Sequence, residues 1–187
     1  ALLLLGGCQD KICQTYDLNN PVYMSYEDLR TAVRDTTPAE INYPGKIYLF
    51  GDYIFVNEVR EGIHVINNAD PSNPVVESFI QIPGNVDLAI KNNILYADSY
   101  VDLVAIDISD LDDIREVARF EDVFRWDIPP YEEGSVVAEV DPSLGVVVDW
   151  DVEEVTEEIE RQPNQFWPVR FWESSFVTMD ATSSLGG

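Results

Sequence analysis

The chain has 187 residues and a formal net charge of -24, because 35 aspartates and glutamates outnumber 11 lysines and arginines. A nucleic-acid-binding protein needs clustered basic residues to displace counterions from phosphates, so this charge argues against nucleic acid as a partner. No apolar run approaches the 18 or so residues of a membrane-spanning helix, which leaves the start of the chain as the one candidate for a targeting segment.

Residues 1–8 resemble the end of a bacterial lipoprotein signal peptide. A leucine run is followed by Gly6, Gly7 and Cys8, where small residues would admit the peptidase and the thiol would accept diacylglycerol. We predict a signal-peptide remnant and lipobox in residues 1–8, lipidation of Cys8, and a bacterial envelope location at the outer membrane. The alternative is an apolar strand ending in Cys8. A disulfide between Cys8 and Cys13 in the mature protein would contradict lipidation.

Residues 9–43 are predicted to form a polar tether, which includes residues 14–21, and one short helix at residues 25–33. Ser25 can cap the free amides of the first helical turn, and Glu27 and Asp28 lie where the helix dipole favours negative charge. Residues 36–38, Thr-Thr-Pro, end the helix. We expect this helix to dock against the edge of the sheets that follow.

Residues 44–123 contain one pattern twice. Pro-Gly occurs at residue 44 and again 39 residues later, and three further residues recur after 40 residues, namely Ile54 as Ile94, Ile66 as Ile106 and Asp70 as Asp110. Each copy has short apolar runs separated by turn residues, which predicts three strands, with a fourth at residues 75–82 and 116–120. Four short antiparallel strands in about 40 residues are typical of a propeller blade.

The sequence of residues 102–110, DLVAIDISD, resembles the motif of the LVIVD-repeat proteins, a bacterial group named for a Leu-Val-Ile-Val-Asp run. Ala105 is the main departure, and residues 63–67 match more loosely. The chain is similar from Cys8 to about Val155 to members of the Bacteroidetes type that carry a lipoprotein leader. The resemblance implies a β-propeller-like protein attached to an envelope membrane, and it implies no reaction.

Residues 124–187 depart from this pattern and are predicted to be an aromatic and acidic insertion that leads to further repeats. Val146, Val148 and Trp150 alternate as one face of a strand. Its continuation to residue 160 could prolong this strand or form an acidic helix, and we favour a strand or irregular structure. Stacked repeats usually need about three units for stability, so two blades predict a fragment of a longer protein with more repeats after residue 187.

The aromatic residues of this last region are the candidate surface for a ligand or partner. They are Trp126, Tyr131, Trp167, Phe171 and Trp172. Aromatic rings provide large contact areas at a low entropic cost and could stack on a sugar or grip a protein. The alternative, which we favour, is that these rings close over the sheets.

His64 is the single histidine, and Val104 occupies its position in the second copy, which indicates a packing role. Asp70 and Asp110 recur beside turn residues, which indicates turn formation. A bound calcium ion is the alternative to a chain without a metal or cofactor. Aspartates, whose carboxylates could bind calcium, crowd one region at positions 98, 102, 107, 110, 112 and 113. Their spacing lacks the glycine and the final glutamate of an EF-hand loop, so we predict no cofactor.

No phosphate-binding glycine loop, nucleophile elbow, zinc spacing or second histidine is present, so the sequence does not indicate an enzyme. We predict an all-β fold, a propeller-like array of antiparallel four-stranded repeats with one short N-terminal helix. The function that fits is a non-catalytic, lipid-anchored envelope protein whose repeats bind a protein or glycan. The alternative is a carbohydrate-active or other hydrolytic propeller with its catalytic acids on missing blades.

Overall fold

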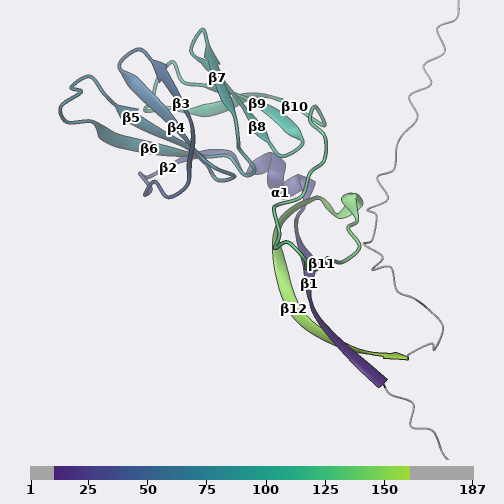
Figure 1. Ribbon diagram of the computed structural model, residues 1–187. Helices are drawn as coiled ribbons and strands as arrows, with labels where there is room; N and C mark the ends of the chain where they lie inside the picture. Colours follow the sequence, from purple (N-terminus) through teal and green to yellow (C-terminus); the bar gives the residue numbers. More distant parts are fainter. Residues whose placement is uncertain (1–10, 161–187) are drawn as a thin grey trace, which may run out of the picture. The chain divides into compact units, whose positions relative to one another are not determined.

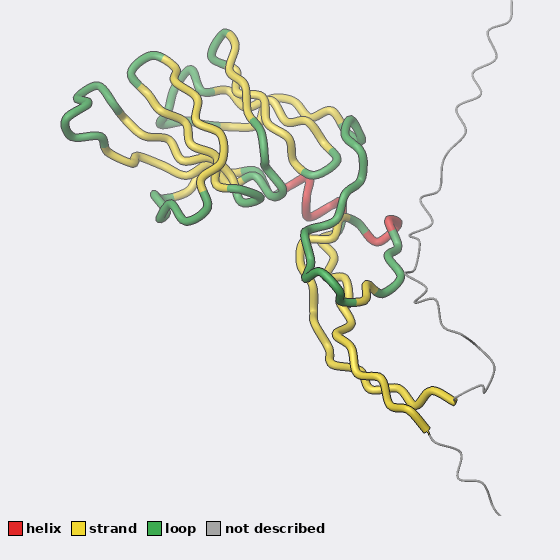
Figure 2. The backbone as a smooth tube through the Cα atoms, viewed as in Figure 1, coloured by secondary structure: helices red, strands yellow, loops and turns green. Residues whose placement is uncertain are grey.

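The computed structural model describes residues 11–160, which are mostly strands joined by short loops (Figures 1 and 2). The strands form three sheets, and α1 (Tyr26–Thr31) is the one α-helix among these residues. The prediction of a β-rich fold with antiparallel sheets and one short helix is confirmed. Residues Thr15–Val155 form one compact unit, and residues 11–14 and 156–160 belong to a second. No helix within the described part of the chain is long and apolar enough to cross a membrane.

The first sheet has the strand order β2-β6-β5-β4-β3. Its strands are β2 (Arg34–Thr36), β3 (Pro44–Phe50), β4 (Tyr53–Glu58), β5 (Gly62–Asn67) and β6 (Val75–Gln81). Strands β3 to β6 follow one another as antiparallel neighbours, as the turn residues between them predicted. The short strand β2 pairs with β6 and adds a fifth strand at that edge.

The second sheet has the order β10-β9-β8-β7 and is antiparallel throughout. Its strands are β7 (Leu88–Lys91), β8 (Ile94–Ser99), β9 (Asp102–Asp107) and β10 (Arg115–Phe120). In the second sheet, β9 and β10 pair in the same register as β5 and β6 in the first sheet. Ile66 lies opposite Val76, and 40 residues later Ile106 lies opposite Glu116, with a bulge next to each of these pairs.

The inner strands differ by one residue from the spacing that the sequence predicted. Residues 59–61 join β4 to β5, whereas residues 100 and 101 alone join β8 to β9. Ile54 lies opposite Ile66, and Leu95 lies opposite Ile106, so Leu95 is the counterpart of Ile54. The predicted pairing of Ile54 with Ile94 is wrong, because the shorter second hairpin moves β8 by one position and a one-residue shift reverses the face of every side chain.

The main core lies between the two sheets and combines one face of each. The first sheet contributes Phe55, Ile63, Val65 and Ile80, and the second contributes Leu88, Ile90, Leu95, Ala97, Val104 and Ile106. Ile106 is fully buried here, but its counterpart Ile66 points away from the core, because side chains alternate along β5 and Val65 points inward. The face of the second sheet that packs on the first sheet therefore corresponds to the face that points away from the core in the first sheet.

Two buried asparagines join the first sheet to the second. Asn57 Nδ2 donates to Asn85 Oδ1 at 2.7 Å, and Asn85 Nδ2 donates to Asp98 Oδ1 at 2.9 Å. Asn57 and Asn85 are both inaccessible to solvent. Buried polar groups of this kind are costly unless they are hydrogen-bonded, so the pair restricts how the two sheets can be placed against each other.

The third sheet has the order β11-β1-β12, with β1 (Lys11–Met24), β11 (Val136–Val137) and β12 (Val146–Glu160). A 3-10 turn at Pro142–Leu144 precedes β12. The strand predicted at residues 146–152 is confirmed, and it continues to Glu160 instead of forming an acidic helix. The tether prediction for residues 14–21 is wrong, because they lie in β1, where buried Asn19 donates from Nδ2 to Ser135 Oγ at 2.6 Å and to the Val136 carbonyl at 3.1 Å.

Helix α1 begins as predicted, because the Ser25 hydroxyl accepts the amide hydrogen of Asp28 at 3.1 Å. It ends at Thr31, earlier than predicted, since β2 takes residues 34–36 into the first sheet. Leu29 is fully buried and packs against Val101, which follows β8, and against Val146 at the start of β12. The expected docking of this helix on the sheets is therefore observed.

Candidate functional site

A cleft of about 1240 Å³ opens at one end of the two sheets. The β3–β4 turn, the start of β6 and the β9–β10 connection all line it. Phe55 and Val65 from the core are among the lining side chains, and Tyr53 is partly exposed beside them. A cleft of this size between two sheets is a typical place for a small ligand or a segment of a partner to bind, and most of its accessible lining is polar.

The rim of the cleft is acidic. Its carboxylates come from Asp35, Asp52, Glu77, Asp110 and Asp112, and the described residues that line the cleft include no lysine, arginine or histidine. Burial raises the pKa of the Tyr53 hydroxyl, and the negative charges of Glu77, Asp112 and Asp52 raise it further. The cleft therefore has a negative potential that favours a positively charged group.

The connections beside the cleft are built by aspartate turns of matching geometry. Asp70 Oδ1 accepts the amide hydrogen of Ser72 at 3.0 Å, and Asp110 Oδ1 accepts that of Asp112 at 3.0 Å. Hydrogen bonds from the Ser72 hydroxyl and amide lower the pKa of Asp70. The predicted role of Asp70 and Asp110 as turn-forming residues is confirmed, and the Asp110 turn places Asp112 at the rim.

The sequence did not identify Asp35, Asp52 or Glu77 as site residues. Each of them lies in a different strand or turn, and they are too far apart along the chain to form a recognisable sequence motif. The available signal was weak, since Gly51 and Asp52 form a pair typical of a turn, which indicates the end of a strand and no binding role. Sheet stacking brings these carboxylates to one cleft.

His64 lies outside this cleft, in the outward face of the first sheet. It is inaccessible to solvent, its Nε2 lies 3.1 Å from Glu58 Oε2, and its ring centroid is 4.8 Å from that of Phe79. His64 lies opposite Phe79 just as Val104 lies opposite Arg119, so the predicted equivalence of His64 and Val104 is confirmed. Its contacts support the packing role rather than a catalytic one.

Glu58, the partner of His64, was not singled out from the sequence. Burial alone would raise its pKa, but hydrogen bonds from the Tyr43 amide, the His64 ring and the Asn42 amide outweigh burial and hold the pKa of Glu58 below its usual 4.5. The carboxylate thus fixes the loop that leads into β3. It is 2% exposed, so these hydrogen bonds are shielded from water.

Replacing Glu58 by glutamine is expected to lower the free energy of unfolding at pH 7 by about 2 kcal/mol, because hydrogen bonds to a charged group contribute about 1.5 to 3 kcal/mol. The folded pKa is depressed, so this contribution is complete above the unfolded value of 4.5 and is lost as the pH falls through the folded value. Urea unfolding from pH 7 to pH 3 should therefore show a narrowing difference between wild type and variant. A difference that stays constant over this range, or that equals the effect of the exposed control Glu153→Gln, would contradict this role.

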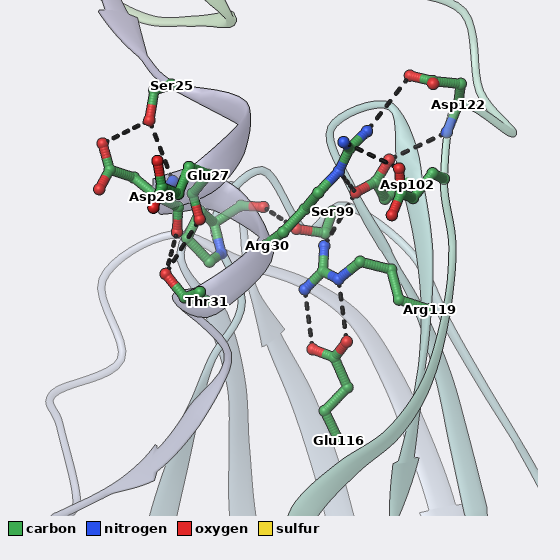
Figure 3. A network of polar contacts seen from close by, with 12 residues as sticks. Ser25, Glu27, Asp28, Arg30, Thr31, Ser99, Asp102, Glu116, Arg119 and Asp122 are labelled. Atoms are coloured by element: carbon green, nitrogen blue, oxygen red, sulfur yellow. Dashed lines mark hydrogen bonds and ion pairs between the residues drawn. The ribbon is translucent and has the colours of Figure 1, made fainter.

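A second buried carboxylate, Asp102, binds two arginines (Figure 3). Its Oδ2 accepts from Arg30 Nε at 3.2 Å and from Arg119 Nη1 at 3.1 Å, and its Oδ1 accepts the Asp122 amide hydrogen at 3.0 Å. Arg119 also makes a two-pronged contact with Glu116 at 2.9 and 2.8 Å. Through Arg30 this network attaches helix α1 to the second sheet.

The six aspartates considered for calcium do not converge. Asp98 and Asp102 lie at the β8–β9 hairpin, and Asp107, Asp110, Asp112 and Asp113 lie at or beyond the opposite end of β9. Asp98 accepts the amide hydrogens of Val86 and Asp87, and Asp102 is occupied by the arginines. Residues 11–160 contain no group of three or more His, Cys, Asp and Glu side chains arranged to hold a metal ion. The absence of a cofactor stays a prediction.

The structure describes two of the five aromatic residues proposed as a binding surface. Trp126 is partly buried against the Leu29 cluster and donates from Nε1 to the Gly145 carbonyl at 3.2 Å. Tyr131 is 47% exposed and meets Trp150 edge-on, with 5.9 Å between the ring centroids. Trp126 thus has a packing role, and Tyr131 presents one accessible ring. Trp167, Phe171 and Trp172 lie outside the described residues, as does Cys8.

Comparisons with protein-family models, with curated proteins and with solved structures found no match to this chain.

Proposed function

We propose that this chain is a non-catalytic, lipid-anchored protein of the bacterial cell envelope, held at the outer membrane, whose two sheets belong to a β-propeller-like array and bind a ligand between them. The observation that carries the binding function is the acidic cleft of about 1240 Å³ between the sheets. The lipobox pattern ending at Cys8 supports the anchor, and the LVIVD resemblance supports the propeller-like array and its envelope location.

The chemistry of the cleft favours a ligand that carries a positive charge next to an apolar or ring-shaped part. Burial and then the charges of Glu77, Asp112 and Asp52 raise the pKa of Tyr53, and the same three carboxylates would attract a cation placed near that hydroxyl. The partly exposed rings of Phe50 and Tyr53 offer aromatic contact beside the rim. A basic segment of a partner protein or an amino-substituted glycan has both features.

Calorimetric titration with spermidine and with a lysine-rich peptide in about 150 mM salt tests this proposal, because that ionic strength screens exposed charges beyond about 8 Å. The double variant Asp52→Asn/Asp112→Asn is expected to weaken binding on the order of tenfold, equivalent to about 1.4 kcal/mol. The matched control is Asp149→Asn/Asp151→Asn, which removes the same charge from exposed positions on β12. It should change the affinity less than twofold.

Equal losses in the two double variants would mean that the net charge of -24 attracts the probe without a defined site, which would overturn the proposed cleft function. Hydrolysis of a glycan that is abolished by Asp52→Asn or Asp112→Asn would instead support the hydrolytic alternative and overturn the non-catalytic assignment.

A further inference from the structure

The outward face of the first sheet carries two rows of apolar side chains that cross its strands. One row is Leu49, Ile54, Ile66 and Val76, and the other is Ile47, Val56, His64 and Phe79. Leu49 is 70% exposed and Ile54, Ile66 and Val76 are partly exposed. In the second row Ile47 is 63% exposed, whereas Val56, His64 and Phe79 are buried within the single chain. Contiguous apolar surface of this kind is costly in water and marks a contact site.

The second sheet has the same two rows, and there they are buried. The row Ile90, Leu95 and Ile106 matches Leu49, Ile54 and Ile66, and the row Leu88, Ala97 and Val104 matches Ile47, Val56 and His64. All six residues of the second sheet are at most 7% exposed and pack on the first sheet. The structure thus shows what covers a face of this type, namely the inward face of a neighbouring sheet.

The second sheet also carries a face that corresponds to the inward face of the first sheet. The first sheet covers its neighbour with Phe55, Ile63 and Ile80, and their counterparts in the second sheet are Tyr96, Leu103 and Phe120. These three lie on the far face of the second sheet, because they alternate with the core residues Leu95 and Val104 and with the inward-pointing Arg119, which pairs with Val104. Phe120 is 52% exposed, and Tyr96 and Leu103 are partly exposed.

We propose that two copies of this chain associate head to tail, the far face of the second sheet in one copy covering the outward face of the first sheet in the other. The contact would continue the sheet packing seen within one chain, with Tyr96, Leu103 and Phe120 on Leu49, Ile54 and Ile66. Such a contact is heterologous, since the two copies use different surfaces. The inference goes beyond the proposed function and requires neither the ligand cleft nor the lipid anchor.

The two surfaces can be blocked separately by Leu49→Asp and Phe120→Asp, which place a charge at positions that are exposed in the single chain. Sedimentation velocity of the wild-type protein from about 1 to 200 μM should show a mass that rises above the monomer. Each variant alone should associate at least tenfold more weakly, because it keeps one surface and lacks the other. An equimolar mixture of the two should form a one-to-one complex, since each supplies the surface that its partner lacks.

Val152→Asp, a change at a 57% exposed apolar residue of β12, is the matched control and should leave the association unchanged. Circular dichroism of each variant confirms that the sheets have formed. A wild-type chain that is monomeric at 200 μM overturns the inference. Association that Leu49→Asp abolishes while Phe120→Asp leaves it intact, or an equimolar mixture that stays monomeric, also overturns it, because the contact would then not join these two faces.

Discussion

Truncation of Ile106 to alanine is expected to lower the free energy of unfolding by about 4 kcal/mol. Ile106 is fully buried in the core between the two sheets, beside core residues of both. Replacing a buried isoleucine by alanine loses the transfer free energy of the removed methyl groups and leaves a cavity, which together cost about 2 to 5 kcal/mol. The strand neighbours Leu95 and Glu116 are fixed by the sheet and cannot collapse into the space.

Ile66→Ala provides a control of the same residue type at the corresponding sheet position, 40 residues earlier. Ile66 is partly exposed on the outward face of the first sheet, so its truncation should cost only about 1 kcal/mol. Urea unfolding at a protein concentration of about 1 μM, followed by circular dichroism, gives both values without a contribution from association. Equal costs for the two variants would contradict the conclusion that the second sheet covers one face of the first.

Replacing Asp102 by alanine is expected to lower the free energy of unfolding by about 3 kcal/mol. The carboxylate is 0% exposed, and its removal leaves Arg119, whose side chain is 8% exposed, with one acidic partner instead of two. Removing one partner of a buried ion pair costs about 3 to 5 kcal/mol, because the remaining charge stays buried. We take the lower end of that range because Glu116 continues to pair with Arg119.

Asp113→Ala is the control, since Asp113 and its partner Arg115 are each 62% exposed. Exposed ion pairs contribute at most about 1 kcal/mol, so this variant should be nearly as stable as the wild type. Thermal unfolding of both variants measures the contrast. A loss for Asp102→Ala no greater than that for Asp113→Ala would show that the network around Asp102 does not stabilise the fold.

Local patterns predicted much of the β structure. The alternation and turn residues of residues 44–120 predicted four strands in each copy, and the fourth strands, predicted at residues 75–82 and 116–120, lie within one residue of their observed ends. Short antiparallel strands and their turns are encoded by neighbours in sequence. The counterpart of Ile54 was misassigned because an apolar spacing cannot show that one hairpin is a residue shorter than another. Strand β1 was missed because its partners, β11 and β12, lie more than 100 residues further along the chain.

The candidate site was less predictable than the fold. Asp35, Asp52, Glu77 and Asp112 reach one cleft only after the two sheets have stacked, and the 35 acidic residues offer many other combinations. Asp102 and Arg119 illustrate the same difficulty. Their pairing depends on the register between β9 and β10, so the sequence placed Asp102 among candidate calcium ligands when its actual partners are arginines.

The hydrogen bond between the side-chain amides of Asn57 and Asn85 helps to hold the two sheets of this strongly acidic chain together. Carboxamides neither gain nor lose protons in water, and neither partner carries a formal charge. Added salt, which weakens exposed ion pairs, therefore leaves the hydrogen bond between Asn57 and Asn85 unaltered. This buried junction is electrically neutral, whereas the exposed contact of Lys46 with Asp87, which also links the two sheets, is an ion pair.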